Sequence, residues 1–356
     1  MSAGFHRLRI AELVQETVDA RSIRFDLPAE LAETFRFRAG QHLTLRAEID
    51  GEDVRRNYSL CVAPSEGQLK VTVKRIAGGR FSSWAADALN EGDTLEVMPP
   101  HGSFTHEFRP GAANHYVGFA GGSGITPVLS LLKTALIEEP QSRFTLFYGN
   151  RDSSSVIFLE ELSGLKNRFM GRLQIHHFLA EEMEDIDLFN GMLDRAKCGE
   201  ILGTLVDPAE VAAFFICGPG PMMDAAEEAL CDSSVPRHKI HIERFTADRP
   251  PEAMARELAE LSTKAAGTTM SVTLDGRTRR VEFTQANILD SARVAGLPAP
   301  FACKAGVCAT CRARVTSGKV EMAARYGLSD EELAAGYILT CQSVPLGEGL
   351  AVDYDA

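Results

Sequence analysis

Short runs of alternating hydrophobic and polar residues dominate the first third of the chain. Examples of these runs are Leu43–Ala47, Leu69–Ile76 and Thr94–Met98. Alternation with a period of two is typical of half-buried strands, so residues 5 to about 108 are predicted to form several short strands. One helix, Ser82–Leu89, is expected among them, with Ser82 or Ser83 as its N-cap. The pattern predicts a small antiparallel β-barrel.

From about residue 115 the hydrophobic runs become continuous, and longer segments separate them. Four runs are interpreted as buried strands: Tyr116–Ala120, Phe144–Tyr148, Leu173–Phe178 and Ala213–Cys217. The segments around them are predicted to be helices: Val128–Ile137, Val156–Leu165, Gly199–Leu205 and Pro221–Leu230. Buried strands that alternate with helices predict a parallel, doubly wound α/β sheet.

The last third begins with a segment rich in proline, alanine and charged residues, and we predict that residues 247–267 form a partly helical linker. A hairpin with an Asp-Gly turn at Asp275 is expected next. The further predicted elements are a helix Ile288–Ala295, a strand Arg312–Ser317 and a short helix Glu331–Ala335. The chain is therefore divided into residues 1–110, 111–246, 247–267 and 268–356.

Composition places this multidomain chain among ordinary globular proteins. It has 356 residues, of which 45% are hydrophobic and 24% are charged. The first ten residues lack the apolar core of a signal peptide, and the longest charge-free run, Tyr116–Leu132, is broken by glycines and a proline. We therefore expect a cytoplasmic protein. The net charge of −12 argues against nucleic acid or an anionic membrane as a partner.

Four of the eight cysteines have a spacing that indicates chemistry. Cys303, Cys308 and Cys311 lie in the stretch C-K-A-G-V-C-A-T-C, and Cys341 follows in L-T-C-Q. This C-x4-C-x2-C…C spacing is the plant-type pattern for one [2Fe–2S] cluster. Gly306 and the small residues around it allow backbone amides to approach the cluster sulfides.

The cysteines allow two other interpretations. A zinc ribbon normally has two C-x2-C arms, whereas only Cys308 and Cys311 have that spacing here. A disulfide framework is typical of small secreted domains, and this chain is long. The iron–sulfur interpretation is preferred. Such a cluster transfers electrons one at a time, so the rest of the chain should explain their source.

The barrel region contains two stretches suited to a flat ligand that carries phosphate. In Arg56-Asn57-Tyr58-Ser59-Leu60, Arg56 and Tyr58 share one face of a strand and Ser59 points to the other. A guanidinium beside an aromatic ring suits a heterocycle with a pyrophosphate, although a surface strand would explain the same pattern. The later stretch from Lys74 to Ser83 contains paired glycines and serines at a helix start, which offer donors to a phosphate.

Three stretches of the α/β region follow strand ends, where ligands bind in doubly wound sheets. They are Gly121–Pro127, Tyr148–Arg151 and Cys217–Met222. The glycines of the first stretch admit a pyrophosphate at the start of a helix. Arg151 is placed to pair with a 2′-phosphate, which favours NADPH, whereas the neighbouring Asp152 would accept from a free 2′-hydroxyl and favour NADH. We prefer NADPH.

These motifs, in this order, resemble the ferredoxin–NADP reductase superfamily. The resemblance implies an FAD-binding β-barrel, an NAD(P)-binding α/β domain and a [2Fe–2S] ferredoxin domain of the β-grasp (α+β) type. It implies that Arg56 binds the FAD pyrophosphate, that Tyr58 stacks on the isoalloxazine and that Ser59 hydrogen-bonds to its N5 edge. The other implied flavin-binding positions are Leu60, Lys74, Gly79, Phe81 and Ser82.

The same resemblance assigns the nicotinamide site. Gly122 and Gly124 would face the pyrophosphate, and Thr126 and Cys217 would flank the nicotinamide; a small buried residue at a strand end is the other explanation of Cys217. The remaining implied positions are Gly121, Asn150, Arg151, Gly218, Pro219 and Met222. Phe245 would either cover the flavin or close the core of the last strand. The implied catalytic residues are Tyr58, Ser59, Thr126 and Cys217.

The three cofactors imply one order of electron transfer. A nicotinamide gives two electrons together, a [2Fe–2S] cluster takes one, and a flavin can do both, so FAD must stand between them. The domain order, the cluster loop and the ending A-V-D-Y-D resemble reductases that serve di-iron oxygenases of phenylacetyl-CoA breakdown. The same domain order occurs in reductases that serve Rieske oxygenases of ketosteroids. We prefer the first group; a non-enzymatic redox sensor is the alternative from another class.

Overall fold

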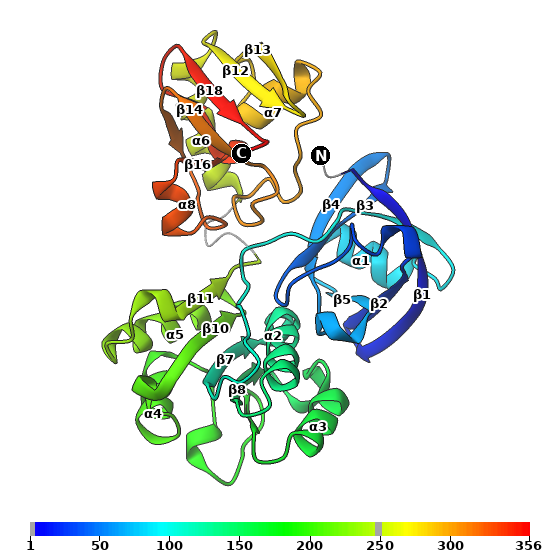
Figure 1. Cartoon of the computed structure of the whole chain (residues 1–356), viewed down its shortest axis with the longest axis vertical. Coiled ribbons are helices and arrows are strands. Elements are labelled where there is room, and N and C mark those ends of the chain that lie inside the picture. The colour runs from blue at the N-terminus through cyan, green and yellow to red at the C-terminus, as the bar shows by residue number, and fades with distance from the viewer. Residues whose placement is uncertain (1–3, 246–250) are drawn as a thin grey trace. The chain divides into compact units, whose positions relative to one another are not determined.

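The computed structural model describes residues 4–245 and 251–356 (Figure 1). These residues form two compact units, Phe5–Glu243 and a second one made mainly of Arg244–Ala356. The first two predicted domains therefore belong to one compact unit. The two units are described separately below.

A six-stranded antiparallel sheet makes up the first half of the first unit. Its strands are β1 (His6–Thr17), β2 (Ala20–Asp26), β3 (His42–Ile49), β4 (Glu52–Ser59), β5 (Leu69–Lys74) and β6 (Thr94–Val97). They are ordered β4-β3-β6-β1-β2-β5, and a bridge between Leu60 and Val71 joins the two outer strands. The sheet is thus closed into the predicted antiparallel barrel.

Helix α1 (Arg80–Asp87) begins earlier than the sequence pattern predicted. Its N-cap is Gly79, not Ser82 or Ser83, so the predicted cap was wrong. Gly78 has a φ of +72°, and this left-handed residue turns the chain into the helix two residues sooner. The Ser82 hydroxyl lies inside the first turn, where it accepts a hydrogen bond from the Ile76 amide at 3.2 Å.

A five-stranded parallel sheet with helices on both faces makes up the second half of the first unit (Figure 1). Its strands are β7 (His115–Gly121), β8 (Arg143–Asn150), β9 (Leu173–Leu179), β10 (Val211–Cys217) and β11 (Ile240–Glu243). Its helices are α2 (Ile125–Glu138), α3 (Leu159–Arg168), α4 (Arg195–Thr204) and α5 (Gly220–Asp232). The order β11-β10-β7-β8-β9 changes direction between β7 and β10, which makes the C-terminal ends of these two strands the topological switch point.

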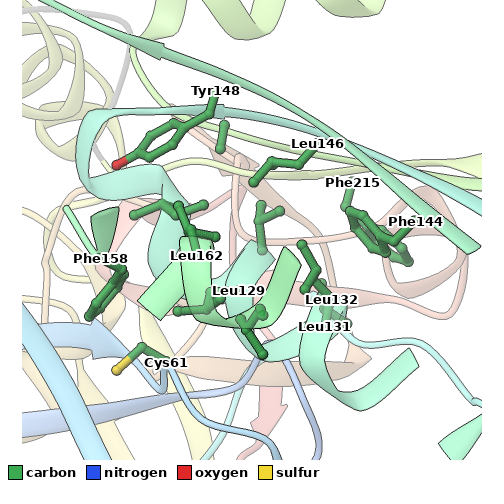
Figure 2. Packing of buried hydrophobic residues seen from close by; sticks show 14 of the residues in the cluster. Cys61, Leu129, Leu131, Leu132, Phe144, Leu146, Tyr148, Phe158, Leu162 and Phe215 are labelled. Atoms are coloured by element: carbon green, nitrogen blue, oxygen red, sulfur yellow. The ribbon is translucent and has the colours of Figure 1, made fainter. Parts of the chain in front are cut away.

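One hydrophobic core continues from the barrel into the parallel-sheet half. Figure 2 shows part of it, in which Cys61 from the barrel half lies in the same cluster as Leu129 and Leu131 of α2. Polar contacts reinforce this junction. The Ser130 hydroxyl donates to the Val62 carbonyl at 2.6 Å, and the buried Lys133 ammonium lies 2.6 Å from Glu66 and 2.7 Å from Glu161. A buried cation with a carboxylate on each side fixes one arrangement of the two halves.

The second unit contains a five-stranded mixed sheet, β13-β12-β18-β14-β16, and a two-stranded sheet, β15-β17. Its strands are β12 (Thr269–Leu274), β13 (Arg277–Glu282), β14 (Arg312–Ser317), β15 (Val320–Met322), β16 (Tyr337–Leu339), β17 (Ser343–Pro345) and β18 (Leu350–Asp353). Its helices are α6 (Pro251–Ala265), α7 (Ile288–Val294) and α8 (Asp330–Ala334). This is the predicted α+β fold.

Helix α6 occupies most of the segment predicted as a linker. Leu258 of α6 is buried in the hydrophobic core of the second unit, so this part of the segment packs as a structural helix. The remaining predicted linker residues before Pro251, numbers 247–250, lie outside the described residues.

Short 3-10 turns complete the description of the chain. They are η1 (Ala29–Leu31), η2 (Pro64–Glu66), η3 (Gly122–Gly124), η4 (Ser153–Ser155), η5 (Asp187–Phe189), η6 (Pro208–Glu210), η7 (Arg237–Lys239) and η8 (Thr340–Gln342). Within the described ranges, every helix is too short or too polar to cross a bilayer.

Candidate functional site

Two glycine-containing loops touch at the switch point of the parallel sheet. A Cβ on Gly124 would lie 2.0 Å from the Cys217 carbonyl oxygen, and one on Gly121 would lie 2.5 Å from the ring of Pro219. Only glycine allows the backbones to approach this closely. The Thr126 hydroxyl donates to the Ser123 carbonyl at 3.0 Å and is buried beside this junction. The structure therefore brings together the predicted residues of the loops after β7 and β10.

The barrel presents the R-x-Y-S stretch along β4. Arg56 is exposed, Tyr58 is partly exposed and Ser59 is buried, so the arginine and the tyrosine share the more open face as predicted from strand alternation. The Tyr58 ring lies 5.6 Å from the ring of Phe81 on α1, and Leu60 is fully buried. An exposed guanidinium and a partly exposed aromatic ring on one face suit a flat heterocycle that carries phosphate.

Close packing at the start of α1 requires a glycine at position 79 and involves Ser82, one of the predicted phosphate-binding residues. A Cβ on Gly79 would lie 2.4 Å from the Ser82 hydroxyl. That hydroxyl already accepts from a backbone amide, so Ser82 supports the turn in this structure. The Lys74 ammonium, at the end of β5, lies 3.7 Å from where a Cβ on Gly122 would stand. A cation from the barrel thus faces the glycine loop of the parallel sheet, where an anionic ligand would be attracted.

Glu243 is a site residue that the sequence analysis missed. It ends β11 and is paired in register with Cys217 on β10. Its carboxyl oxygen accepts from the Ser59 hydroxyl at 3.2 Å, which links the barrel to the parallel sheet. Burial raises the pKa of Glu243 to about 8, and the hydrogen bond from Ser59 opposes this only in part. The sequence does contain a signal for Glu243, because a charged residue directly follows the apolar residues of a buried strand.

The raised pKa of Glu243 gives a testable dependence of stability on pH. An ordinary carboxyl with pKa 4.5 ionises in the unfolded chain while the folded protein keeps its proton up to about pH 8. Folding therefore takes up a proton in this window. As pH rises from about 4.5 to 8, Glu243 lowers the free energy of unfolding by at most about 1.4 kcal/mol per pH unit. Glu243→Gln removes this contribution to the pH dependence. Chemical denaturation of both proteins should show a stability advantage of the variant that grows from pH 5 to pH 8, and an advantage that does not change with pH would contradict the assignment.

The Cys217 thiol is buried, and burial followed by the charge of Glu243 raises its pKa well above the ordinary value. A protonated thiol is a poor nucleophile. Cys217 is therefore suited to packing and polar contact at the strand end, and the structure gives no reason for a covalent thiol step.

Asn150 and Arg151 lie at the C-terminal end of β8. The polar atoms of the Asn150 side chain are buried, and the amide interacts with the Tyr148 hydroxyl. An amide offers more than one donor and acceptor, and a ligand at this sheet edge would satisfy the remaining ones. The exposed Arg151 side chain donates from Nε to Asp152 at 2.8 Å, and Glu181 lies 4.0 Å away.

Phe245 is 39% exposed, which excludes the alternative that it closes a core. It follows the first unit and belongs to the second one. Its proposed role in covering a flavin stays a prediction.

The four predicted cluster cysteines lie in the second unit and are all free thiols. All four side chains lie close enough to interact electrostatically, and their hydrogen bonds form two pairs, Cys303 with Cys308 and Cys311 with Cys341. Within the described part of the chain, no group of three or more His, Cys, Asp or Glu side chains is arranged to hold a metal ion. Two pairs of thiols fit a two-iron cluster, which takes two ligands on each iron, better than a single tetrahedral zinc.

The cluster loop is shaped by backbone conformations and by one glutamine. Lys304 and Ala309 both have a φ of +53°, and a Cβ on Gly306 would lie 3.0 Å from Ala324 and Gln342. The Gln342 side chain donates to the Lys304 carbonyl at 2.9 Å, and the Ala305 amide points at the Cys303 sulfur at 3.3 Å. This tight loop with amides directed at sulfur suits a cluster that accepts hydrogen bonds.

Comparison with protein families matches three consecutive parts of the chain. Residues 7–106 match an oxidoreductase FAD-binding domain, residues 119–228 an oxidoreductase NAD-binding domain, and residues 272–346 a 2Fe-2S iron–sulfur cluster binding domain. The predicted cofactors FAD, a nicotinamide nucleotide and [2Fe–2S] are thus confirmed at the level of the domains.

The chain is also similar over its full length to characterised proteins. It is 43% identical to one subunit of the 1,2-phenylacetyl-CoA epoxidase of Escherichia coli K12, over 99% of this chain and 98% of the relative. It is 37% identical to the ferredoxin reductase component of 3-ketosteroid-9-alpha-monooxygenase from Rhodococcus rhodochrous, over 98% and 96%. The solved structure of phthalate dioxygenase reductase has a TM-score of 0.60 and 27% identity, and the match covers 98% of each chain.

Proposed function

This chain belongs to the ferredoxin–NADP reductase superfamily, among the members that join FAD, NAD and [2Fe–2S] domains, and on that premise we propose that it is the reductase of a multicomponent oxygenase. Electrons enter from NAD(P)H and leave through the [2Fe–2S] domain to an oxygenase subunit. The observation that supports this most strongly is 43% identity, over nearly the whole chain, to a subunit of a phenylacetyl-CoA epoxidase.

A bound FAD would supply the chemistry that joins a two-electron donor to a one-electron acceptor. Arg56 and Lys74 would bind its phosphates, Tyr58 and Phe81 would hold its ring, and the Ser59 hydroxyl would hydrogen-bond at the N5 edge. Leu60, Gly79 and Ser82 shape the surrounding backbone. Gly121, Gly122 and Gly124 admit the nucleotide pyrophosphate, and Gly218, Pro219 and Met222 pack against that loop.

Thr126 and Cys217 are proposed to position the nicotinamide at the switch point, Thr126 from the first turn of α2 and Cys217 from the end of β10. Both side chains are buried, so they exclude water from the crevice. Cys303, Cys308, Cys311 and Cys341 are proposed as the four cluster ligands.

We propose phenylacetyl-CoA epoxidase as the partner oxygenase, which makes the acceptor a di-iron enzyme of phenylacetate catabolism in the cytoplasm. The second candidate is a Rieske oxygenase such as ketosteroid 9α-hydroxylase, favoured by 37% identity to its reductase component. Purified reductase should be mixed in turn with each oxygenase, and substrate-dependent NAD(P)H oxidation measured. Coupled turnover with the ketosteroid enzyme alone would overturn the first choice.

The redox-sensor alternative predicts no turnover, whereas a reductase should reduce cytochrome c rapidly with NAD(P)H. The presence of matched FAD- and NAD-binding domains in the same chain supports the reductase. Steady-state cytochrome c reduction by the full chain decides between the two, because a sensor would show only a negligible rate.

We propose NADPH as the preferred nucleotide, with Arg151 as the residue that binds the 2′-phosphate. Asp152 anchors the guanidinium through Nε, which orients the side chain at the end of β8. Arg151→Ala should raise the KM for NADPH about tenfold and leave the KM for NADH nearly unchanged, because only NADPH carries the extra phosphate. Arg168→Ala, an exposed arginine on α3, is the matched control.

One observation favours NADH. The Glu182 carboxylate accepts from the Ser153 amide at 2.7 Å and from the Ser153 hydroxyl at 2.9 Å. These two donors lie beside Arg151 in the sequence, and because they are occupied by a carboxylate they are not open to the 2′-phosphate of NADPH. If the wild-type enzyme has the lower KM for NADH and Arg151→Ala affects both nucleotides equally, the preference for NADPH is wrong.

A further inference from the structure

The end of the chain lies against the segment that carries one of the proposed cluster ligands. Tyr354 directly follows β18, and its ring packs against the hydrophobic core of the second unit. The Tyr354 hydroxyl donates to the Thr340 hydroxyl at 2.8 Å. Thr340 is fully buried and is the residue before Cys341. The last tyrosine of the chain therefore contacts the immediate neighbour of a cluster cysteine.

Thr340 joins two separate parts of the proposed ligand set. Its backbone amide and its hydroxyl both donate to the Cys311 carbonyl, at 3.2 and 2.9 Å. Cys311 is the last cysteine of the cluster loop, whereas Cys341 follows Thr340 in a later segment. Two hydrogen bonds to one carbonyl therefore hold together the backbones of the two cysteines whose side chains form one of the pairs.

The hydroxyl protons have defined places in this chain of hydrogen bonds. A threonine hydroxyl has one proton, and Thr340 gives its proton to the Cys311 carbonyl. The Thr340 oxygen is then an acceptor for Tyr354, so the tyrosine is the donor. Hydrogen bonds in a chain polarise one another, and donation by Tyr354 therefore strengthens the bond from Thr340 to Cys311.

Contacts on either side of Tyr354 hold it in place. Its backbone amide donates to the Thr273 carbonyl of β12 at 3.0 Å. The Asp355 carboxylate accepts from the Asp275 and Gly276 amides, at 2.9 and 2.8 Å, in the turn between β12 and β13. The end of the chain is thus fastened before and after the side chain, which leaves the hydroxyl little freedom to move away from its acceptor.

The Tyr354 hydroxyl is also close to the thiols of this pair. Burial raises the pKa of Tyr354, and the Cys311 and Cys341 thiols raise it further. The hydroxyl therefore lies within electrostatic reach of both sulfur atoms. A polar O–H group at this place acts on any charge that develops on the two cysteines.

We propose that Tyr354 is a positioning residue for the [2Fe–2S] cluster and that, through Thr340, it raises the reduction potential of the cluster. The inference rests on the proposed function, because it takes Cys311 and Cys341 as ligands of one iron. Potentials of such clusters depend on the hydrogen bonds around the ligands. A cluster held by four thiolates is anionic, and reduction adds a further negative charge. A fixed donor beside the Cys311–Cys341 pair therefore stabilises the reduced form and favours electron transfer into the cluster.

The test is a redox titration of the full-length holoprotein in which the EPR signal of the reduced cluster is followed. Tyr354→Phe keeps the ring and removes only the hydroxyl. We expect the equilibrium constant for cluster reduction to fall about threefold, which is about 30 mV for a one-electron couple. Tyr337→Phe on β16 is the matched control, because Tyr337 makes its contact through the ring, which lies 4.6 Å from the Arg312 guanidinium. This control should keep the wild-type potential.

Variants of Thr340 show whether Tyr354 acts through the threonine hydroxyl. Thr340→Ser keeps the hydroxyl and should keep the wild-type potential, whereas Thr340→Val removes it with little change of shape and should lower the potential. Adding Tyr354→Phe to Thr340→Val should cause no further decrease, because the hydrogen bond between the two residues is already lost. A tyrosine that only packed against the core would give independent effects in the double variant.

A potential that is not lowered in Tyr354→Phe, or independent effects in the double variant, would overturn the proposal. If Tyr354→Phe does not fold, Thr340→Val decides alone, because it removes the same hydrogen bond from the other side. An unchanged potential in Thr340→Val would then overturn the proposal. A reduced wild-type protein without a [2Fe–2S] EPR signal would instead overturn the proposed ligand set and with it the proposed function.

Discussion

Replacement of Cys341 by alanine is expected to stop electron delivery while hydride entry continues. Cys341 is buried, comes from a separate segment and pairs with Cys311, so its loss would leave one iron of the proposed cluster with a single thiolate. Iron content should fall, and NAD(P)H-dependent cytochrome c reduction should fall at least about 100-fold, because the cluster is the one-electron outlet. Ferricyanide, which takes electrons directly from reduced flavin, should still be reduced within about twofold of the wild-type rate.

The matched control for this prediction is Cys231→Ala. Cys231 is an exposed thiol at the end of α5, outside the cluster loop, and the chemical change is the same. This variant should keep its iron and both activities. A Cys341→Ala protein that keeps its iron and reduces cytochrome c normally would show that another group is the fourth ligand.

Gly124→Ala is expected to have the second large effect, on nucleotide binding. The added methyl would lie 2.0 Å from the Cys217 carbonyl oxygen and 2.7 Å from the Gly218 amide nitrogen, both of which are backbone atoms. The two loops at the switch point must separate, at a cost of about 1–3 kcal/mol for overpacking. Because the nicotinamide is proposed to bind between them, the KM for NAD(P)H should rise about tenfold or more.

Gly164→Ala provides the comparison for this change. Gly164 lies inside α3, and nothing stands within 4 Å of a Cβ placed on it. Alanine should therefore stabilise the helix by about 0.5–1 kcal/mol and leave the KM unchanged. Equal KM values for Gly124→Ala and wild type, measured by stopped-flow flavin reduction, would show that the loop contact does not shape the nucleotide site.

Local patterns were sufficient for the sheets and for the three domains that carry the candidate site. Strand periodicity predicted the barrel, the parallel sheet and the α+β unit, because burial of one or both faces fixes the pattern of each strand. The spacing from Cys303 to Cys341 predicted the cluster loop, since a small cluster needs ligands at set intervals. The contact between Gly124 and Cys217 agrees with the prediction that the special loops share one sheet edge.

What the sequence did not reveal depends on contacts between distant residues. Glu243 becomes a site residue only because β11 pairs with β10 and the barrel brings Ser59 to the same place, 184 residues away in the chain. The later start of α3 has a local cause that the pattern did not reveal. Phe158, the residue before α3, has a φ of +65°, and the predicted helix start at Val156 was therefore wrong.

The polar segment before residue 268 was interpreted as a linker because charged helix formers are typical of both tethers and surface helices. Only tertiary packing distinguishes the two, and Leu258 is buried in a core whose members lie mostly after residue 268.

The continuous core around Cys61, Leu129 and Lys133 determines where this protein can be divided. A fragment that ended near residue 110 would expose apolar surface on both pieces and leave a buried ammonium group without one of its carboxylates. Recombination between related reductases should therefore exchange residues 5–243 as a single block. For the same reason we expect the flavin and nucleotide halves to be inherited together.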